Sequence, residues 1–158
     1  MTGPESKLER IAQAIQDCVA GVTEEAGYAV TVSECLRPKR SDEVKLEDYL
    51  VLLGQMEDAP AESMPQGYDD LVQRFTLDLF VLVGEDEDDP IDTVLNRFRA
   101  EVLRAVLADR QWDGLALDTI FEGGEPFATS AGSAEGLRLT LAVTYRTLEN
   151  DPYDGALD

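Results

Sequence analysis

Residues 70–84 alternate in a way that predicts the central strand of a sheet. One face is apolar at every second position and consists of Phe75, Leu77, Leu79, Val81 and Val83. The opposite face begins with Thr76 and Asp78 but continues with Phe80 and Leu82. A strand that is apolar on both faces is typical of the interior of a sheet, whereas an edge or surface strand keeps one face polar. We therefore expect the rest of the chain to be layered on this strand.

Two stretches have the spacing of amphipathic helices. Ser6 and Glu9 have the form of a capping box, and apolar residues then recur at helical intervals until Gly21. A second helix is predicted to start at Pro90, because proline suits the first helical turn, and to end near Asp109. Its apolar stripe consists of Ile91, Val94, Leu95, Phe98, Val102, Ala105 and Val106.

Four further strands are predicted around the central one. The first alternates from Tyr28 and ends before Pro38, the second covers residues 48–56, the fourth covers 115–121 and the fifth covers 137–146. A short buried helix also fits 48–56, because an apolar run without a clear period suits either element. Residues 57–70 and 123–136 lack periodicity, and we expect both to be loops.

The resulting order, α-β-β-β-α-β-β, predicts the α+β class. Consecutive strands without intervening helices favour antiparallel pairing, so we expect a mostly antiparallel sheet of about five strands covered by two helices. A chain of 158 residues can bury one sufficient core. We expect a single domain over residues 1–148, followed by an acidic C-terminal tail over 149–158.

Charge and the absence of histidine exclude several classes of function. Thirteen Lys and Arg residues stand against thirty-three Asp and Glu residues, which gives a net charge of −20. Nucleic acid and anionic membranes are bound mainly through Lys and Arg, so neither is an expected target. Without histidine there is no Ser-His or Cys-His nucleophile and almost no route to a zinc site. Cys18 and Cys35 are expected to be buried or half-buried thiols of a cytoplasmic protein.

The acidic residues do not form a recognisable catalytic or metal site. Residues 85–92 and 109–114 resemble calcium loops only in part, because Pro90 interrupts the first and Ile120 replaces the final carboxylate of the second. Asp78 and Asp118 could be the carboxylate pair of a glycoside hydrolase, but positions on the solvated side of a strand explain them better. We therefore expect no catalytic residue, no metal and no cofactor.

Seven residues are candidates for a protein interface. Large apolar side chains in otherwise polar segments suit an interface, although packing onto their own domain explains them equally well: Met64, Tyr68, Phe127 and Tyr153. Basic residues gather in a short stretch that also includes Lys45 and forms a positive patch on an acidic protein: Arg37, Lys39 and Arg40. This patch would suit an acidic neighbour, such as residues 85–89 of another copy.

The layout resembles the tail-terminator, or tail-completion, proteins of long-tailed bacteriophages and related phage-derived particles. The resemblance covers nearly the whole chain. It rests on the N-terminal amphipathic helix, the strand at 49–54, the long loop before residues 74–83, the single helix from Asp89 and Pro90, the stretch 112–117, and the closing strand 137–146 with Asp151 and Pro152 behind it.

The resemblance implies a structural role without catalysis. Members of the family form a ring, usually of six subunits, that caps the finished tail tube, stops its growth and offers a surface to the head connector. The implied partners are copies of the chain itself, tail-tube protein and a connector or neck protein, and DNA would pass through the ring without specific binding. The implied location is the tail or neck of the virion, after assembly in the host cytoplasm. A head-completion or neck protein is the main alternative, and a small acidic hydrolase is a further one.

Overall fold

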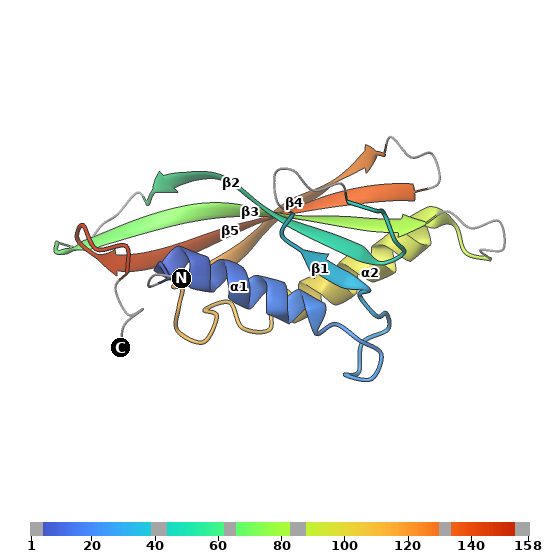
Figure 1. Cartoon of the computed structure of the whole chain (residues 1–158), viewed down its shortest axis with the longest axis horizontal. Coiled ribbons are helices and arrows are strands. Elements are labelled where there is room, and N and C mark those ends of the chain that lie inside the picture. The colour runs from blue at the N-terminus through green and yellow to red at the C-terminus, as the bar shows by residue number, and fades with distance from the viewer. Residues whose placement is uncertain (1–4, 39–43, 62–65, 83–87, 130–133, 154–158) are drawn as a thin grey trace.

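The computed structural model describes residues 5–38, 44–61, 66–82, 88–129 and 134–153, and it places two helices on one face of a five-stranded sheet (Figure 1). The elements are α1 (Lys7–Ala20), β1 (Glu34–Leu36), β2 (Leu50–Pro60), β3 (Tyr68–Leu82), α2 (Ile91–Val106), β4 (Asp118–Ala128) and β5 (Ala134–Leu148). The strand order is β1-β2-β3-β5-β4, and every pair except β1 with β2 is antiparallel. The predicted α+β class, element order and mostly antiparallel sheet are confirmed.

The centre of the fold is the pairing of β3 with β5. Each strand has fifteen residues, and they pair in continuous register from Tyr68 opposite Leu148 to Leu82 opposite Ala134. Figure 1 shows the two strands side by side along the long axis of the molecule. Seven side chains of these strands on the face toward the helices are fully buried: Phe75, Leu77, Leu79, Val81, Leu139, Leu141 and Val143. The prediction that β3 is the central strand is confirmed.

The helices cover that apolar face through the stripes that their spacing predicts. In α1 the Ser6 hydroxyl accepts a hydrogen bond of 3.1 Å from the backbone N–H of Glu9, so half of the predicted capping box forms. The Glu9 carboxylate binds Arg37 instead of turning back to Ser6. In α2 the buried residues are Val94, Leu95, Phe98, Val102, Ala105 and Val106, and the helix ends at Val106 rather than near Asp109.

The first predicted strand is mostly wrong. Only Glu34–Leu36 forms β1, and it pairs in parallel with the start of β2. Before β1 the backbone makes hydrogen bonds outside the sheet. The N–H of Val32, for example, donates to the carbonyl of Val22 at 2.8 Å. The alternation from Tyr28 to Val32 is therefore a run of core contacts, because Val30 and Val32 are buried without belonging to a strand.

The predicted loop over residues 57–70 is wrong at both ends. β2 continues to Pro60 and β3 begins at Tyr68. A β-bulge between Gln55 and Asp58 interrupts the register. At that bulge the buried side-chain amide of Gln73 donates a hydrogen bond of 2.9 Å to the carbonyl of Met56. One extra residue shifts which side chains face the core, so a strand with a bulge loses the period that would identify it.

The predicted loop over residues 123–136 is also wrong at both ends, and residues 130–133 lie outside the described residues. β4 starts at Asp118, later than predicted, and runs through both glycines to Ala128, while β5 already begins at Ala134. A second bulge lies between Phe121 and Gly123, where Gly123 has a φ of 127° that other residues rarely adopt. Gly123 therefore permits a bend inside β4 and does not end the strand.

The described part of the C-terminal tail is attached to the domain. The backbone N–H of Lys7 donates to the carbonyl of Pro152 at 3.0 Å, and the N–H of Glu149 donates to Gly67 at 3.0 Å. Residues 149–153 thus close the end of the sheet against the start of α1. Within the described ranges, no helix is long and apolar enough to cross a membrane.

The burial of β3 yields a direct test of the layered fold. Leu79→Asn should lower the free energy of unfolding by at least about 3 kcal/mol, because it removes a fully buried apolar side chain and leaves an amide without partners. Leu82→Asn is the matched control, since Leu82 lies on the same strand but is 39% exposed and should cost less than about 1 kcal/mol. Equal urea midpoints for the two variants would contradict the fold.

Candidate functional site: the open face of the sheet

The face of the sheet that points away from α1 and α2 is the candidate functional surface, and we call it the open face. It carries every second side chain of the strands, including Arg74 and Asp78 of β3, Arg138 and Arg146 of β5 and Glu122 of β4. None of these side chains belongs to the core that the helices cover. The open face therefore combines a rigid backbone with charged side chains.

Two arginines of β5 each bind one carboxylate of β3 through two nitrogens of the guanidinium group. Arg138 donates to the two oxygens of Asp78 at 2.7 and 2.9 Å, and Arg146 donates to those of Asp70 at the same distances. In both cases the partners are directly opposite in the strand register. Bidentate pairs of this kind fix side-chain geometry as well as charge.

A third pair spans three strands. Arg74 of β3 reaches past β5 to Glu122 of β4, with contacts of 2.7 and 3.2 Å. The register explains the reach, because Ala142 is the residue of β5 that lies beside Arg74, and its small side chain leaves the path open. Glu122 itself sits in the bulge of β4. The three pairs together tie β3, β5 and β4 across the open face.

Phe127 is part of this face and not a free loop anchor. It lies on β4 opposite Gly136, and its ring meets the ring of Phe80 edge to face at 5.5 Å between centroids. A Cβ atom at Gly136 would overlap the Phe127 ring, so the ring lies across β5 only because that residue is glycine. The guanidinium carbon of Arg138 stands 5.8 Å from the same ring. Phe127 thus packs partly onto its own domain, and its role in an interface stays a prediction.

The other predicted interface residues do not gather in one patch. Tyr68 is 39% exposed at the start of β3, with Arg146 5.1 Å from its ring, and Tyr153 is 40% exposed after the final turn. Tyr68 pairs with Leu148 and Phe127 with Gly136, which are twelve residues apart on β5, or about 40 Å. Lys39, Arg40 and Met64 lie outside the described residues.

Arg37 is already paired within the chain. Its guanidinium donates to both oxygens of Glu9 on α1 at 2.6 and 2.9 Å, and more weakly to Gln55 at 3.4 Å. The hydrogen bonds from Arg37 lower the pKa of Glu9, although burial opposes the shift. The charge of Arg37 is thus largely neutralised within its own chain. This weakens the expectation that Arg37 binds an acidic segment of another copy.

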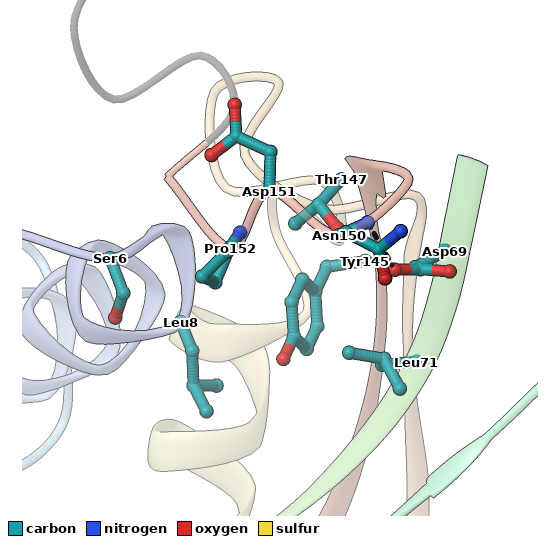
Figure 2. Close-up of a pocket in the computed structure, with 9 residues that line it drawn as sticks. All are labelled: Ser6, Leu8, Asp69, Leu71, Tyr145, Thr147, Asn150, Asp151 and Pro152. Atoms are coloured by element: carbon teal, nitrogen blue, oxygen red, sulfur yellow. Dashed lines mark hydrogen bonds between the residues drawn. The ribbon is translucent and has the colours of Figure 1, made fainter. Parts of the chain in front are cut away.

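A cavity of about 320 Å³ lies where α1 starts over the end of the sheet. It is lined by Ser6, Leu8, Asp69, Leu71, Tyr145, Thr147, Asn150, Asp151 and Pro152, and Figure 2 shows the phenol ring of Tyr145 between Leu8 and Leu71. Burial raises the pKa of Tyr145, so its hydroxyl is neutral at pH 7 and is no base. The Ser6 hydroxyl is used as the helix cap. Neither the Ser6 hydroxyl nor the Tyr145 hydroxyl is therefore available as an activated nucleophile in this cavity.

The remaining candidates for chemistry are also explained by structure. Burial raises the pKa of Cys18, and that of Cys35 to about 12, so neither thiol is activated. Asp78 and Asp118 pair with positions 138 and 144 of β5, six residues or about 20 Å apart, which is too far for a glycosidase pair. The described segments contain no group of three or more Cys, Asp or Glu side chains that could hold a metal ion.

Sequence reasoning missed the arginine–carboxylate pairs. Their partners are 48 to 76 positions apart in the chain, so only the strand register brings them together. The available signal was the alternation of Arg138 and Arg146 with the apolar face of β5, which predicted a solvated side for that strand. A comparison with protein-family models finds no match to this chain, and a comparison with curated proteins finds none either.

The Asp70–Arg146 pair predicts a specific pH dependence of stability. The hydrogen bonds from Arg146 hold the pKa of Asp70 below its usual 3.8, so the pair stabilises the fold fully above that pH and loses its effect as pH falls through the native pKa. Asp70→Asn should therefore cost about 1–2 kcal/mol of unfolding free energy at pH 7, and progressively less below pH 4.

The matched control is Asp78→Asn, because both partners of that pair are more exposed: the Asp78 and Arg138 side chains are 16% and 47% exposed, against 6% and 35% for Asp70 and Arg146. An exposed pair should contribute less than about 1 kcal/mol. Urea unfolding of wild type and both variants from pH 7 to pH 3 measures the difference. A constant gap between wild type and Asp70→Asn over this range would show that the charge of Asp70 does not contribute.

Proposed function

We propose that this chain is a structural subunit of a ring, and that the ring is a tail terminator that caps a phage-type tail tube. The observation that carries the proposal is the open face, where three bidentate pairs hold charged side chains in place and neither of the two described helices covers the strands. The same face exposes Met56 and Ile120, which are 50% and 53% accessible. Fixed polar groups next to exposed apolar ones suit a protein partner.

The state of the carboxyl groups supports binding over hydrolysis. A hydrolase of the acidic type needs one carboxyl group with a raised pKa as its general acid. Among the described residues, the carboxyl groups with a shifted pKa are Glu9, Asp70 and Glu101, and an arginine lowers the pKa of each. Groups of this kind stay ionised and bound to their partners, which is useful for a rigid surface and unsuitable for proton donation.

The terminator assignment itself rests on the resemblance of the layout, and a neck protein is the alternative it must be separated from. Both would be structural rings in the same particle, and they differ in their partner. A terminator binds the end of the tube of tail-tube protein, whereas a neck protein binds the portal or its adaptor. A pull-down that uses the purified chain against each of these components separates the two roles.

Removal of the protein tests the proposed function in the particle. Particles assembled without this chain should have tails of abnormal length that are not joined to heads, because nothing would stop tube growth or offer the joining surface. Electron micrographs of negatively stained lysates measure tail length and attachment. Tails of normal length that remain joined to heads would contradict the proposal, and heads that lose DNA beside normal free tails would favour the neck role.

The charge of the chain predicts how subunits respond to salt. Copies with a net charge of −20 repel one another, and Arg37 is neutralised by Glu9 within its own chain. Self-association should therefore strengthen between 0.01 M and 0.15 M salt, as the Debye length falls from about 30 Å to about 8 Å. Sedimentation velocity at several salt concentrations checks this, and dissociation of assemblies over that range would indicate attractive charge pairs between subunits instead.

A further inference from the structure

The sheet ends in two strand edges that the described part of the chain leaves without a strand partner. β4 is the last strand of the sheet and pairs only with β5. On the other side, β1 pairs with just the first three residues of β2, so residues 53–60 of β2 pair only with β3. Unpaired strand edges are templates for pairing with another chain.

The two edges fit each other in strand direction. The strands β2, β3, β5 and β4 are successively antiparallel, so β2 and β4 run in opposite directions. If a second copy is placed beside the first in the same orientation, its β2 lies antiparallel to β4 of the first, and the helices of both copies stay on the same side. We propose that β4 of one copy pairs with residues 53–60 of the next copy, which continues the sheet from subunit to subunit.

This inference rests on the proposed ring and explains how the ring would close. An interface between two different surfaces of the same chain is heterologous, and repeated contacts of this kind form a closed ring when the rotation per subunit allows it. Pairing of one edge with an identical edge would instead stop at a dimer. Each subunit in the ring would use both of its edges, so the assembly would have no free edge left.

Side chains on the open face support this pairing. Among the described residues, Ile120 and Met56 are the most exposed large apolar side chains. They lie at opposite edges of one row of the sheet, because Ile120 is opposite Ala142, Ala142 is opposite Arg74, and Met56 lies in the bulge across from Arg74. Continuing the sheet would therefore bring Ile120 of one copy next to Met56 of the following copy and cover both.

Two prolines limit the paired length on each side. Pro60 and Pro126 cannot donate a backbone hydrogen bond, and each lies near the far end of its edge. The stretches before them are residues 53–59 of β2 and 118–125 of β4, which are nearly equal in length. The matching lengths allow an antiparallel ladder of about seven residues, which is longer than the typical five-residue strand.

Acidic residues at both edges explain how a single copy avoids uncontrolled pairing. Glu57 and Asp58 lie on the β2 edge, and Asp118 lies at the start of the β4 edge. Like charges across the ladder oppose association at low salt, and charged residues are a common protection of free edges. Screening by salt then permits pairing, in agreement with the salt dependence expected from the net charge.

The test uses one blocking substitution for each edge. Ile120→Glu blocks β4 and Met56→Glu blocks β2, and both positions are about half exposed, so each variant should fold. Each variant alone should lose rings at concentrations where wild type is assembled at 0.15 M salt, with self-association weakened at least about tenfold. Leu148→Glu is the matched control, since Leu148 is 45% exposed but lies six residues along β5 from Ala142, which is in the row of Ile120 and Met56, and should keep its rings.

Mixing the two variants gives the decisive result. The β4 edge of the Met56→Glu copy and the β2 edge of the Ile120→Glu copy are both intact, so an equal mixture should form a dimer with one copy of each and no larger species. Native mass spectrometry resolves the two masses. The inference would be overturned if either single variant formed rings or homodimers. It would also be overturned if the mixture contained nothing but monomers, or if the wild type stayed monomeric. Particles lacking the chain test the proposed function separately, because abnormal tails would remain even if subunits join through other surfaces.

Discussion

The uninterrupted pairing of β3 with β5 is the interaction on which the rest of the structure depends. It sets two fifteen-residue strands in register, and this register creates both faces of the sheet at once. On one face it aligns Phe75 and Leu77 with Leu141 and Leu139, which gives the helices an apolar surface to cover. On the other face it places arginines opposite carboxylates. The core and the candidate interface are thus two consequences of one strand alignment.

The sequence predicted those elements whose period is uninterrupted. Both helices, the central strand and β5 were recognisable, because their apolar residues recur at constant spacing and are buried where the spacing places them. Errors occurred where the backbone changes the period. The end of β2 was predicted to be a loop, because the bulge at Met56 interrupts its period. The end of β4 was predicted to be a loop, because Gly123 and Gly124 suggest a break in a strand. Bulges depend on a partner strand, so a local pattern does not reveal them.

The candidate site was less accessible to sequence reasoning than the fold. Phe127 was chosen because a glycine-rich segment offers no core, yet Gly136 of the neighbouring strand makes room for its ring beside Phe80. Arg37 was chosen for its charge, yet Glu9 binds it. In both cases the exposure and the partners of the side chain are decided by residues that are distant in the chain. The edges of β2 and β4 became visible only with the strand order.

We propose that copies of this chain form a ring at the end of a tail tube, joined edge to edge through their sheets. Electron cryo-microscopy of tails isolated with the bound protein tests this most directly, because it resolves both the position of the protein and the strand contacts between copies. The account predicts one ring at the head-proximal end of the tube, with β4 of each subunit antiparallel to β2 of the next. Protein distributed along the tube, bound only at the portal, or absent from tails would contradict it.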